Sequence, residues 1–313
     1  MHLRTSTIAA LTAAALVPAA AMAATIDGTD ANEKLKGTAQ TDTINGNGGN
    51  DFLLGLAGDD LLSGGPGNDR IWGGPDNDTI TGVQGNDRLF GGPGNDTITG
   101  DVNGTGDRTS YDRIHGGDGD DTLNGGDSRD HIDGGNGNDT SDGGNGNDRM
   151  SGGAGDDTQN GGDGNDVIFA NAGVDVSNGG NGNDVLWAMA RTDVTGAGDV
   201  IADTLDGGPG NDRFRTRDGE ADKITCGDGN DRAELDTVDI ITDATTENPN
   251  GSCERVTRKA PHAREDRSES AADHAASDAD KAAAREAVEA ARQAVKEARE
   301  ALREARHHRH GHR

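Results

Sequence analysis

The chain has little apolar or aromatic material from which to build a hydrophobic core. Aromatic residues make up 2% of its 313 residues, and the mean hydropathy is −0.80. Such a composition normally leaves a chain disordered, because too little apolar surface is buried to offset the lost chain entropy. The 51 glycines raise that entropic cost further. Order must therefore come from something other than a hydrophobic core.

Basic residues are also scarce relative to acidic ones. The formal net charge is −28, and the segment from Thr25 to Thr257 carries about −31. This sign excludes nucleic acid as the expected partner, because nucleic acid is bound through basic residues. Carboxylates at this density repel one another, and a divalent cation would remove the repulsion.

The first 23 residues are predicted to be an export signal. His2 and Arg4 precede the apolar run Ile8–Val17, and Ala21-Met22-Ala23 forms a small-residue cleavage site. An uncleaved anchor is the alternative, but the run is short for a membrane span. We expect a secreted, extracellular mature chain that begins at Ala24 and has no membrane span, with association with the cell surface as a further option.

A nine-residue pattern, G-G-x-G-x-D-x-U-x with U a large apolar residue, repeats along most of the chain. Its clearest copy is Gly64–Trp72, and further copies begin at Gly91, Gly116, Gly134, Gly143, Gly161 and Gly179. The register spans residues 46–234 in about twenty turns, with degenerate copies in residues 24–45. Insertions interrupt it at Gly100–Gly106 and at Ala188–Ala197.

A period of eighteen residues lies within the nine-residue one. The seventh residue of successive repeats alternates between Arg or His and Thr, as in Arg70, Thr79, Arg88 and Thr97. Two repeats per coil, one in each of two sheets, would produce this alternation, and the first insertion preserves it. Within a repeat, the six Gly/Asn/Asp-rich residues should form a turn. The last three residues should form a strand with residue eight inward.

The inward residues should form two facing stacks, one side chain deep for each strand. Ile or Leu occupies most of these positions, but Ser141, Gln159 and Ser177 interrupt a single sheet. We predict weaker packing between about Gly134 and Asn178.

The aspartate at position six is the one side chain that the turns keep. Calcium takes six to eight hard oxygen ligands at flexible geometry, and glycine turns expose backbone carbonyls beside this carboxylate. Magnesium is a poorer fit, because it requires strict octahedral geometry. Gly-Asn-Asp segments are also simply good turns, but a column of unpaired aspartates would repel without a cation. The candidate metal ligands are Asp51, Asp60, Asp69, Asp78, Asp87, Asp96, Asp121, Asp130, Asp139, Asp148, Asp157, Asp166, Asp184, Asp212 and Asp231.

Residues 46–231 resemble the RTX, or hemolysin-type, calcium-binding repeat proteins. The resemblance implies an all-β solenoid, a calcium-bound parallel β-roll with ions along both edges and the aspartates above as ligands. Three turns depart from the family pattern: Asp76 replaces a glycine, Ser128-Arg129 alters a second turn, and residues 170–173 lack the opening glycine pair. These departures put the sites at Asp78, Asp130 and Asp175 in question.

The segment 235–257 should cap the roll. Cys226 and Cys253 are the two cysteines, and in an exported chain we expect them to form a disulfide, with free thiols as the alternative. The bridge would contribute about 3 kcal/mol on the loop-entropy model. It would also cover exposed strand edges.

The sequence changes character after the roll. Residues 258–277 are predicted to be a linker and 278–306 a single Ala-rich α-helix, either solvated alone or self-associating as a coiled coil. The His/Arg-rich tail, 307–313, could bind zinc or nickel loosely, or contact anionic cell-envelope polymer.

We predict no catalytic activity, because the mature chain leaves no segment for a catalytic domain and contains no HExxH motif. Tyr111 with His115 is the single candidate cluster. A structural or adhesive surface role is favoured. The alternatives are a glycan-binding module using an Arg–aromatic strand face, an ice-binding module using the Thr face, and, last, an enzyme.

Overall fold

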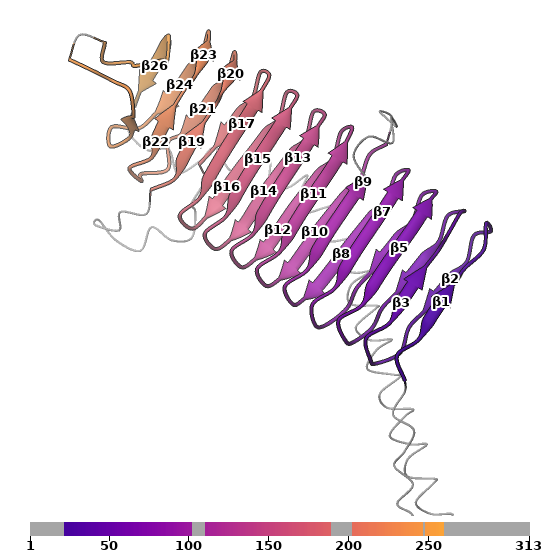
Figure 1. Ribbon diagram of the computed structural model, residues 1–313. Helices are drawn as coiled ribbons and strands as arrows, with labels where there is room; N and C mark the ends of the chain where they lie inside the picture. Colours follow the sequence, from indigo (N-terminus) through magenta and orange to yellow (C-terminus); the bar gives the residue numbers. More distant parts are fainter. Residues whose placement is uncertain (1–21, 102–109, 189–201, 247, 260–313) are drawn as a thin grey trace, which may run out of the picture.

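The chain folds into an elongated parallel β-solenoid. The computed structural model describes residues 22–101, 110–188, 202–246 and 248–259. The chain alternates between two 12-stranded parallel sheets that face each other, so that each coil contributes one strand to each sheet (Figure 1). We call them sheet A and sheet B. This confirms the predicted all-β roll.

Sheet A contains the strands β1 (Thr25–Asp27), β3 (Thr43–Asn45), β5 (Leu61–Pro66), β7 (Thr79–Gln84), β9 (Thr97–Asp101), β11 (Thr122–Asp127), β13 (Thr140–Asn145), β15 (Thr158–Asp163), β17 (Val176–Asn181), β19 (Thr204–Asp206), β22 (Lys223–Thr225) and β25 (Ile240–Ile241). Sheet B contains β2 (Lys34–Lys36), β4 (Phe52–Leu54), β6 (Arg70–Trp72), β8 (Arg88–Pro93), β10 (Arg113–Asp118), β12 (His131–Asn136), β14 (Arg149–Ala154), β16 (Val167–Ala172), β18 (Val185–Trp187), β21 (Arg213–Thr216), β24 (Arg232–Leu235) and β26 (Arg255–Arg258). A two-stranded sheet pairs β20 (Pro209–Gly210) with β23 (Asp228–Gly229).

The strand register confirms the eighteen-residue period. Arg70 pairs with Arg88 in sheet B, and Thr79 pairs with Thr97 in sheet A. The first insertion leaves the register intact, because Arg88 pairs next with Arg113. The stack is therefore continuous across the insertion.

Many strands are longer than the predicted three residues. In the central coils they run for six residues and include the opening glycines of the next repeat, as in β12, where Gly135 pairs with Gly117. The prediction assigned these glycines to the turn. They extend the strand instead, because a residue without a side chain lets neighbouring coils approach closely: a Cβ on Gly135 would collide with the carbonyl of Gly117.

A thin core separates the two sheets. The eighth residue of each repeat points inward and is buried, as for Ile71, Ile80 and Leu89. Ser141, Gln159 and Ser177 are also buried and follow one another in sheet A, as predicted. The hydroxyl of Ser177 donates to Oε1 of Gln159 at 3.1 Å, whereas Nε2 of Gln159 has no partner among the described residues.

Several predicted segments lie outside the described residues. These are nearly all of the signal segment 1–23 and nearly all of the linker, helix and tail that follow residue 257. Within the part of the chain that the structure describes, no helix is long and apolar enough to cross a membrane.

Candidate metal sites along the two edges

Two columns of carboxylates line the edges of the roll, each immediately before a strand. We call them the edge-A column, which precedes the strands of sheet A, and the edge-B column, which precedes those of sheet B. The edge-A column contains Asp42, Asp60, Asp78, Asp96, Asp121, Asp139, Asp157, Asp175, Asp203, Asp222 and Asp239. The edge-B column contains Glu33, Asp51, Asp69, Asp87, Asp112, Asp130, Asp148, Asp166, Asp184, Asp212, Asp231 and Glu254.

One oxygen of each aspartate links its coil to the preceding coil. The backbone N–H of Asp130 donates to Oδ1 of Asp148 at 2.8 Å, and the N–H of Asp148 donates to Oδ1 of Asp166 at 2.8 Å. The bond persists across the first insertion, where the N–H of Asp87 donates to Oδ1 of Asp112 at 2.8 Å. The columns therefore join successive coils as well as collecting charge.

The second carboxylate oxygen has a different environment. Oδ2 of almost every column aspartate is buried and has no hydrogen-bond partner among the described residues, including Asp69, Asp87 and Asp148. A buried, unpartnered carboxylate oxygen is costly. Its repetition at every coil points to a ligand that all the turns share.

The opening glycine of each turn shows where that ligand would bind. A Cβ placed on Gly143 would lie 2.5 Å from the carbonyl oxygen of Gly161 and 2.6 Å from Oδ2 of Asp148. At Gly125 the same two kinds of oxygen, from Gly143 and Asp130, lie at 2.6 Å and 2.7 Å. A carboxylate and a carbonyl from the next coil thus border one small space, which only glycine leaves open.

Burial and mutual repulsion disfavour the ionised form of these aspartates. Loss of solvent raises the pKa of Asp87 to about 8, and the charges of Asp69 and Asp101 add to this effect. Burial likewise raises the pKa of Asp130 and of Asp175 to about 8. At neutral pH, bound protons or cations would relieve this cost.

The donor set fits calcium. Carboxylate and backbone carbonyl oxygens are the ligands calcium prefers, and its flexible coordination suits a turn that supplies both. Described residues of both columns contribute no sulfur or imidazole, which zinc and copper favour. The columns can hold hard divalent cations and have no arrangement typical of a nucleophile and base.

A family model described as the RTX calcium-binding nonapeptide repeat matches residues 27–62, 54–87, 81–102, 112–141, 142–159, 151–186 and 197–233. The chain belongs to the RTX calcium-binding repeat family. Repeats of this family bind calcium in multiple copies, so calcium is the ion of this RTX roll. A comparison with curated proteins gave no match.

The structure places every aspartate predicted as a ligand in one of the two columns, together with others that the prediction did not include. Among the additional members, Asp42 and Asp112 lie eighteen residues before Asp60 and Asp130, so the spacing alone contained the signal. Their turns are degenerate or interrupted, which is why the nine-residue pattern missed them.

The departing turns keep their place in the stack. Asp76, Ser128 and Asn171 each adopt a positive φ, at 83°, 94° and 77°, a conformation that glycine adopts without strain. Asp78 and Asp130 nevertheless keep the column hydrogen bonds on both sides. The strain is confined to the turn and does not break the column.

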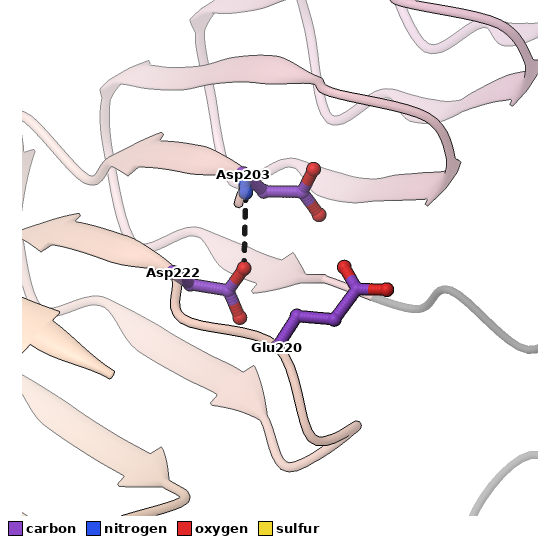
Figure 2. Close-up of side chains that lie close together, drawn as sticks. All are labelled: Asp203, Glu220 and Asp222. Atoms are coloured by element: carbon purple, nitrogen blue, oxygen red, sulfur yellow. Dashed lines mark hydrogen bonds between the residues drawn. The ribbon is translucent and has the colours of Figure 1, made fainter. Parts of the chain in front are cut away.

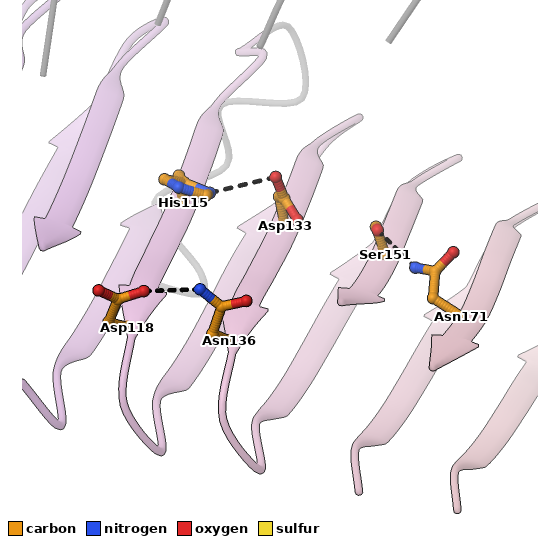
Figure 3. Close-up of polar contacts among 6 residues, drawn as sticks. All are labelled: His115, Asp118, Asp133, Asn136, Ser151 and Asn171. Atoms are coloured by element: carbon orange, nitrogen blue, oxygen red, sulfur yellow. Dashed lines mark hydrogen bonds and ion pairs between the residues drawn. The ribbon is translucent and has the colours of Figure 1, made fainter. Parts of the chain in front are cut away.

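Tyr111 and His115, the one candidate catalytic cluster, have different partners in the structure. The Arg113 guanidinium lies over the Tyr111 ring, 5.0 Å from its centroid. Nδ1 of His115 lies 3.1 Å from Oδ2 of Asp133 on the neighbouring strand (Figure 3). Figure 3 also shows Asn136 donating to Asp118, so polar side chains on this face pair between coils as well.

The predicted disulfide is present. Cys226 and Cys253 are bonded and buried, with their Cα atoms 5.2 Å apart. The hydroxyl of Ser252 accepts the N–H of Cys226 at 3.0 Å. The bridge attaches the segment after β25 to the last coils, where the pairing strands end.

Proposed function

We propose that this RTX protein is exported, folds when it meets extracellular calcium, and serves a structural or adhesive role at the cell surface. The single observation that carries the proposal is the repetition of buried Oδ2 atoms without partners along both columns. An unfolded chain does not concentrate these charges, so calcium binding and folding become one event.

The difference in calcium concentration between the inside and the outside of the cell would make this coupling of folding to calcium binding useful. Cytosolic calcium is kept low and extracellular calcium is high, so the same chain would remain extended and exportable inside and become rigid outside. The predicted export signal in residues 1–23 supports this route. The disulfide agrees with an oxidising environment outside the cell.

A calcium titration of the chain from Ala24 onward tests the folding step. We expect far-UV circular dichroism to change from a disordered to a β-rich spectrum as calcium rises, with a parallel loss of protease sensitivity. Magnesium at the same concentration should do much less. A spectrum that does not respond to calcium would contradict the proposal.

Attachment to the cell surface is tested by deletion. Removing residues 260–313 takes away most of the predicted linker together with the predicted helix and the His/Arg-rich tail, and keeps Arg258 and Lys259, which bond to the last coils, so surface association should be lost and calcium-dependent folding kept. Surface association that persists after the deletion would show that the roll itself, rather than the tail, makes the contact.

Binding of acidic glycans is the second candidate, favoured by a specific surface of sheet B. Phe52, Trp72 and Phe90 follow one another along this surface: the Phe52 and Trp72 rings are tilted, with centroids 4.8 Å apart, and the Trp72 and Phe90 rings are stacked, with centroids 5.0 Å apart. Beside them, Arg70, Arg88 and Arg113 lie in register on adjacent strands.

These arginines and Tyr111 line a recess of about 250 Å³, together with Asn68, Asn86 and the column residues Asp69 and Asp87. Cationic side chains beside aromatic rings suit a carboxylated or sulfated sugar polymer. A glycan array with the calcium-bound protein tests this candidate. Replacing Arg70 and Arg113 by Gln should abolish any acidic-glycan signal, whereas Gln at Arg213 and Arg232, a distant pair on sheet B, should not.

A further inference from the structure

The turn before β22 lacks all three glycines of the RTX pattern. Counting back from Asp222 at position six, the glycine positions one, two and four hold Arg217, Asp218 and Glu220. Two of these three replacements are acidic, in a region that is already negative. Substitution of glycine by a carboxylate in an acidic turn needs an explanation.

Glu220 brings a third carboxylate to two column aspartates. One ligand oxygen from each of Asp203, Glu220 and Asp222 lies within 4.8 Å of the others (Figure 2). Among the described residues, this is the one group of three or more potential ligand side chains that meets this criterion. Elsewhere in each column, the hydrogen bonds join one aspartate to the next aspartate of the same column, one coil away.

All three carboxylates are buried. Asp203, Glu220 and Asp222 are 1%, 4% and 0% exposed. Oδ1 of Asp222 accepts the N–H of Asp203 at 3.0 Å, but Oδ2 of Asp203 and Oδ2 of Asp222 have no hydrogen-bond partner among the described residues. The column hydrogen bond therefore fixes Asp222 in place and leaves its second oxygen available.

The size of the group suits calcium. Three oxygens at mutual separations of up to 4.8 Å share a centre about 2.8 Å or less from each, close to calcium–oxygen distances of about 2.3–2.6 Å. The N–H of Glu220 donates to Oδ1 of Asp218 at 3.0 Å, which orders the turn that carries the third ligand.

Neighbouring charges increase the need for a cation. Asp236 and Asp239 are buried nearby in the same cap, and Asp222 donates its N–H to Oδ1 of Asp239 at 3.3 Å. The guanidinium of Arg258 donates to the backbone carbonyls of Asp236 and Asp239. It therefore binds the chain of the cap rather than the three clustered carboxylates.

We propose that Asp203, Glu220 and Asp222 form a separate calcium site with three carboxylate ligands, which binds the ion at lower free calcium than the repeat turns. A third carboxylate raises the negative charge of the site, and ligand charge count is a main determinant of calcium affinity. The inference rests on the proposed calcium-dependent folding of the roll, but it concerns a turn that the repeat pattern does not describe.

Calcium titration followed by hydrogen–deuterium exchange mass spectrometry of the full mature chain tests the site, because peptides report on each region separately. Peptides covering residues 216–225 should become protected at lower calcium than peptides from 139–166. Glu220→Gln, which keeps the shape and removes the charge, should raise the calcium midpoint of the 216–225 peptides by about tenfold.

Glu234→Gln is the matched control. Glu234 lies in the adjacent coil, where it pairs with Arg232 on the surface at 2.7 Å, and its loss should leave the midpoint unchanged. Glu220→Gly restores the glycine of the repeat pattern and should shift the midpoint in the same direction as Gln, which guards against a folding defect specific to one variant. Native mass spectrometry at low free calcium should show one fewer bound ion in both Glu220 variants.

The outcomes separate this inference from the proposed function. Equal midpoints for the wild-type chain, Glu220→Gln and Glu234→Gln in the 216–225 peptides would overturn the site while leaving the roll's calcium response intact. Calcium protection that appears in 216–225 and never in 139–166 would support the site and contradict calcium-dependent folding of the roll. Absence of protection in both regions would overturn both.

Discussion

Removing calcium at neutral pH should unfold the roll, and acid should partly restore it without calcium. In this experiment a chelator first removes calcium at neutral pH, and the pH is then lowered to about 4. Both calcium and protons neutralise the same buried carboxylates, so either should permit the coils to stack. This competition is specific to a fold whose stability depends on cancelling charge.

The magnitude follows from the raised pKa values. Burial raises the pKa of Asp87 and of Asp130 from the ordinary 3.8 to about 8 in the calcium-free fold. The folded state then binds more protons than the unfolded state, so its stability is complete below pH 3.8 and is lost as the pH rises from there toward 8. One pKa unit corresponds to about 1.4 kcal/mol, so each of the two costs the calcium-free fold about 4 kcal/mol at neutral pH.

A few such aspartates outweigh the whole stability of an ordinary domain, which is about 5–15 kcal/mol. Circular dichroism and limited proteolysis of the chain from Ala24 measure the result. We expect a disordered, protease-sensitive chain in chelator at neutral pH, and recovery of β structure on acidification. The calcium midpoint should also rise as the pH falls, because protons compete for the ligands. A chain that is equally compact and protease-resistant in chelator and in calcium at neutral pH would refute the reasoning.

Three further predictions concern single positions in the calcium-bound protein. Asp148→Asn should raise the calcium midpoint and lower stability by about 1–3 kcal/mol in a thermal melt, whereas Asn at the outward-facing Asp142 should change little. Gln159→Leu should change stability by less than about 1 kcal/mol in a thermal melt, because the removal of a buried amide nitrogen without a partner is offset by the loss of the acceptor for the Ser177 hydroxyl; a fall of several kcal/mol would show that this amide is satisfied. Cys253→Ser should cost about 3 kcal/mol and increase hydrogen exchange mainly after Cys226, and uniform exchange along the roll would contradict a local role for the bridge.

Much of the fold was predictable because two features of the repeat indicate it: the alternation of residue types at position seven and the apolar residue at position eight. The alternation of Arg70, Thr79, Arg88 and Thr97 assigned residues to the two sheets before any coordinates, and the strand register agrees. Inward placement of the eighth residue followed from the two-residue period of a strand. Strand length was not predictable in the same way, because glycine is typical of turns and here also permits close pairing.

The candidate site was predictable in its residues but not in its geometry. Position six selected carboxylates that the structure places in the two columns, yet no sequence pattern shows that Oδ1 bonds the preceding coil while Oδ2 has no partner among the described residues. Glu220 had no signal at all, because it lies in a position where the pattern expects glycine. Its role depends on how the turn folds back on Asp203 and Asp222, which is a three-dimensional property.

The polar stretch of the core shows what holds successive coils together. Across β13, β15 and β17 the inward residues are Ser141, Gln159 and Ser177, so sheet A contributes almost no apolar contact there. The strands nevertheless keep the same register, and the column bond from Asp139 to Asp157 keeps its 2.8 Å length. Loss of the hydrophobic side chains has no effect on coil spacing, whereas the hydrogen bonds and oxygen-lined spaces of the edges continue without a break. Along this stretch, successive coils are therefore joined by the strand pairing and by the hydrogen bonds of the edges, and we propose that the ion that neutralises those edges controls whether the stack forms.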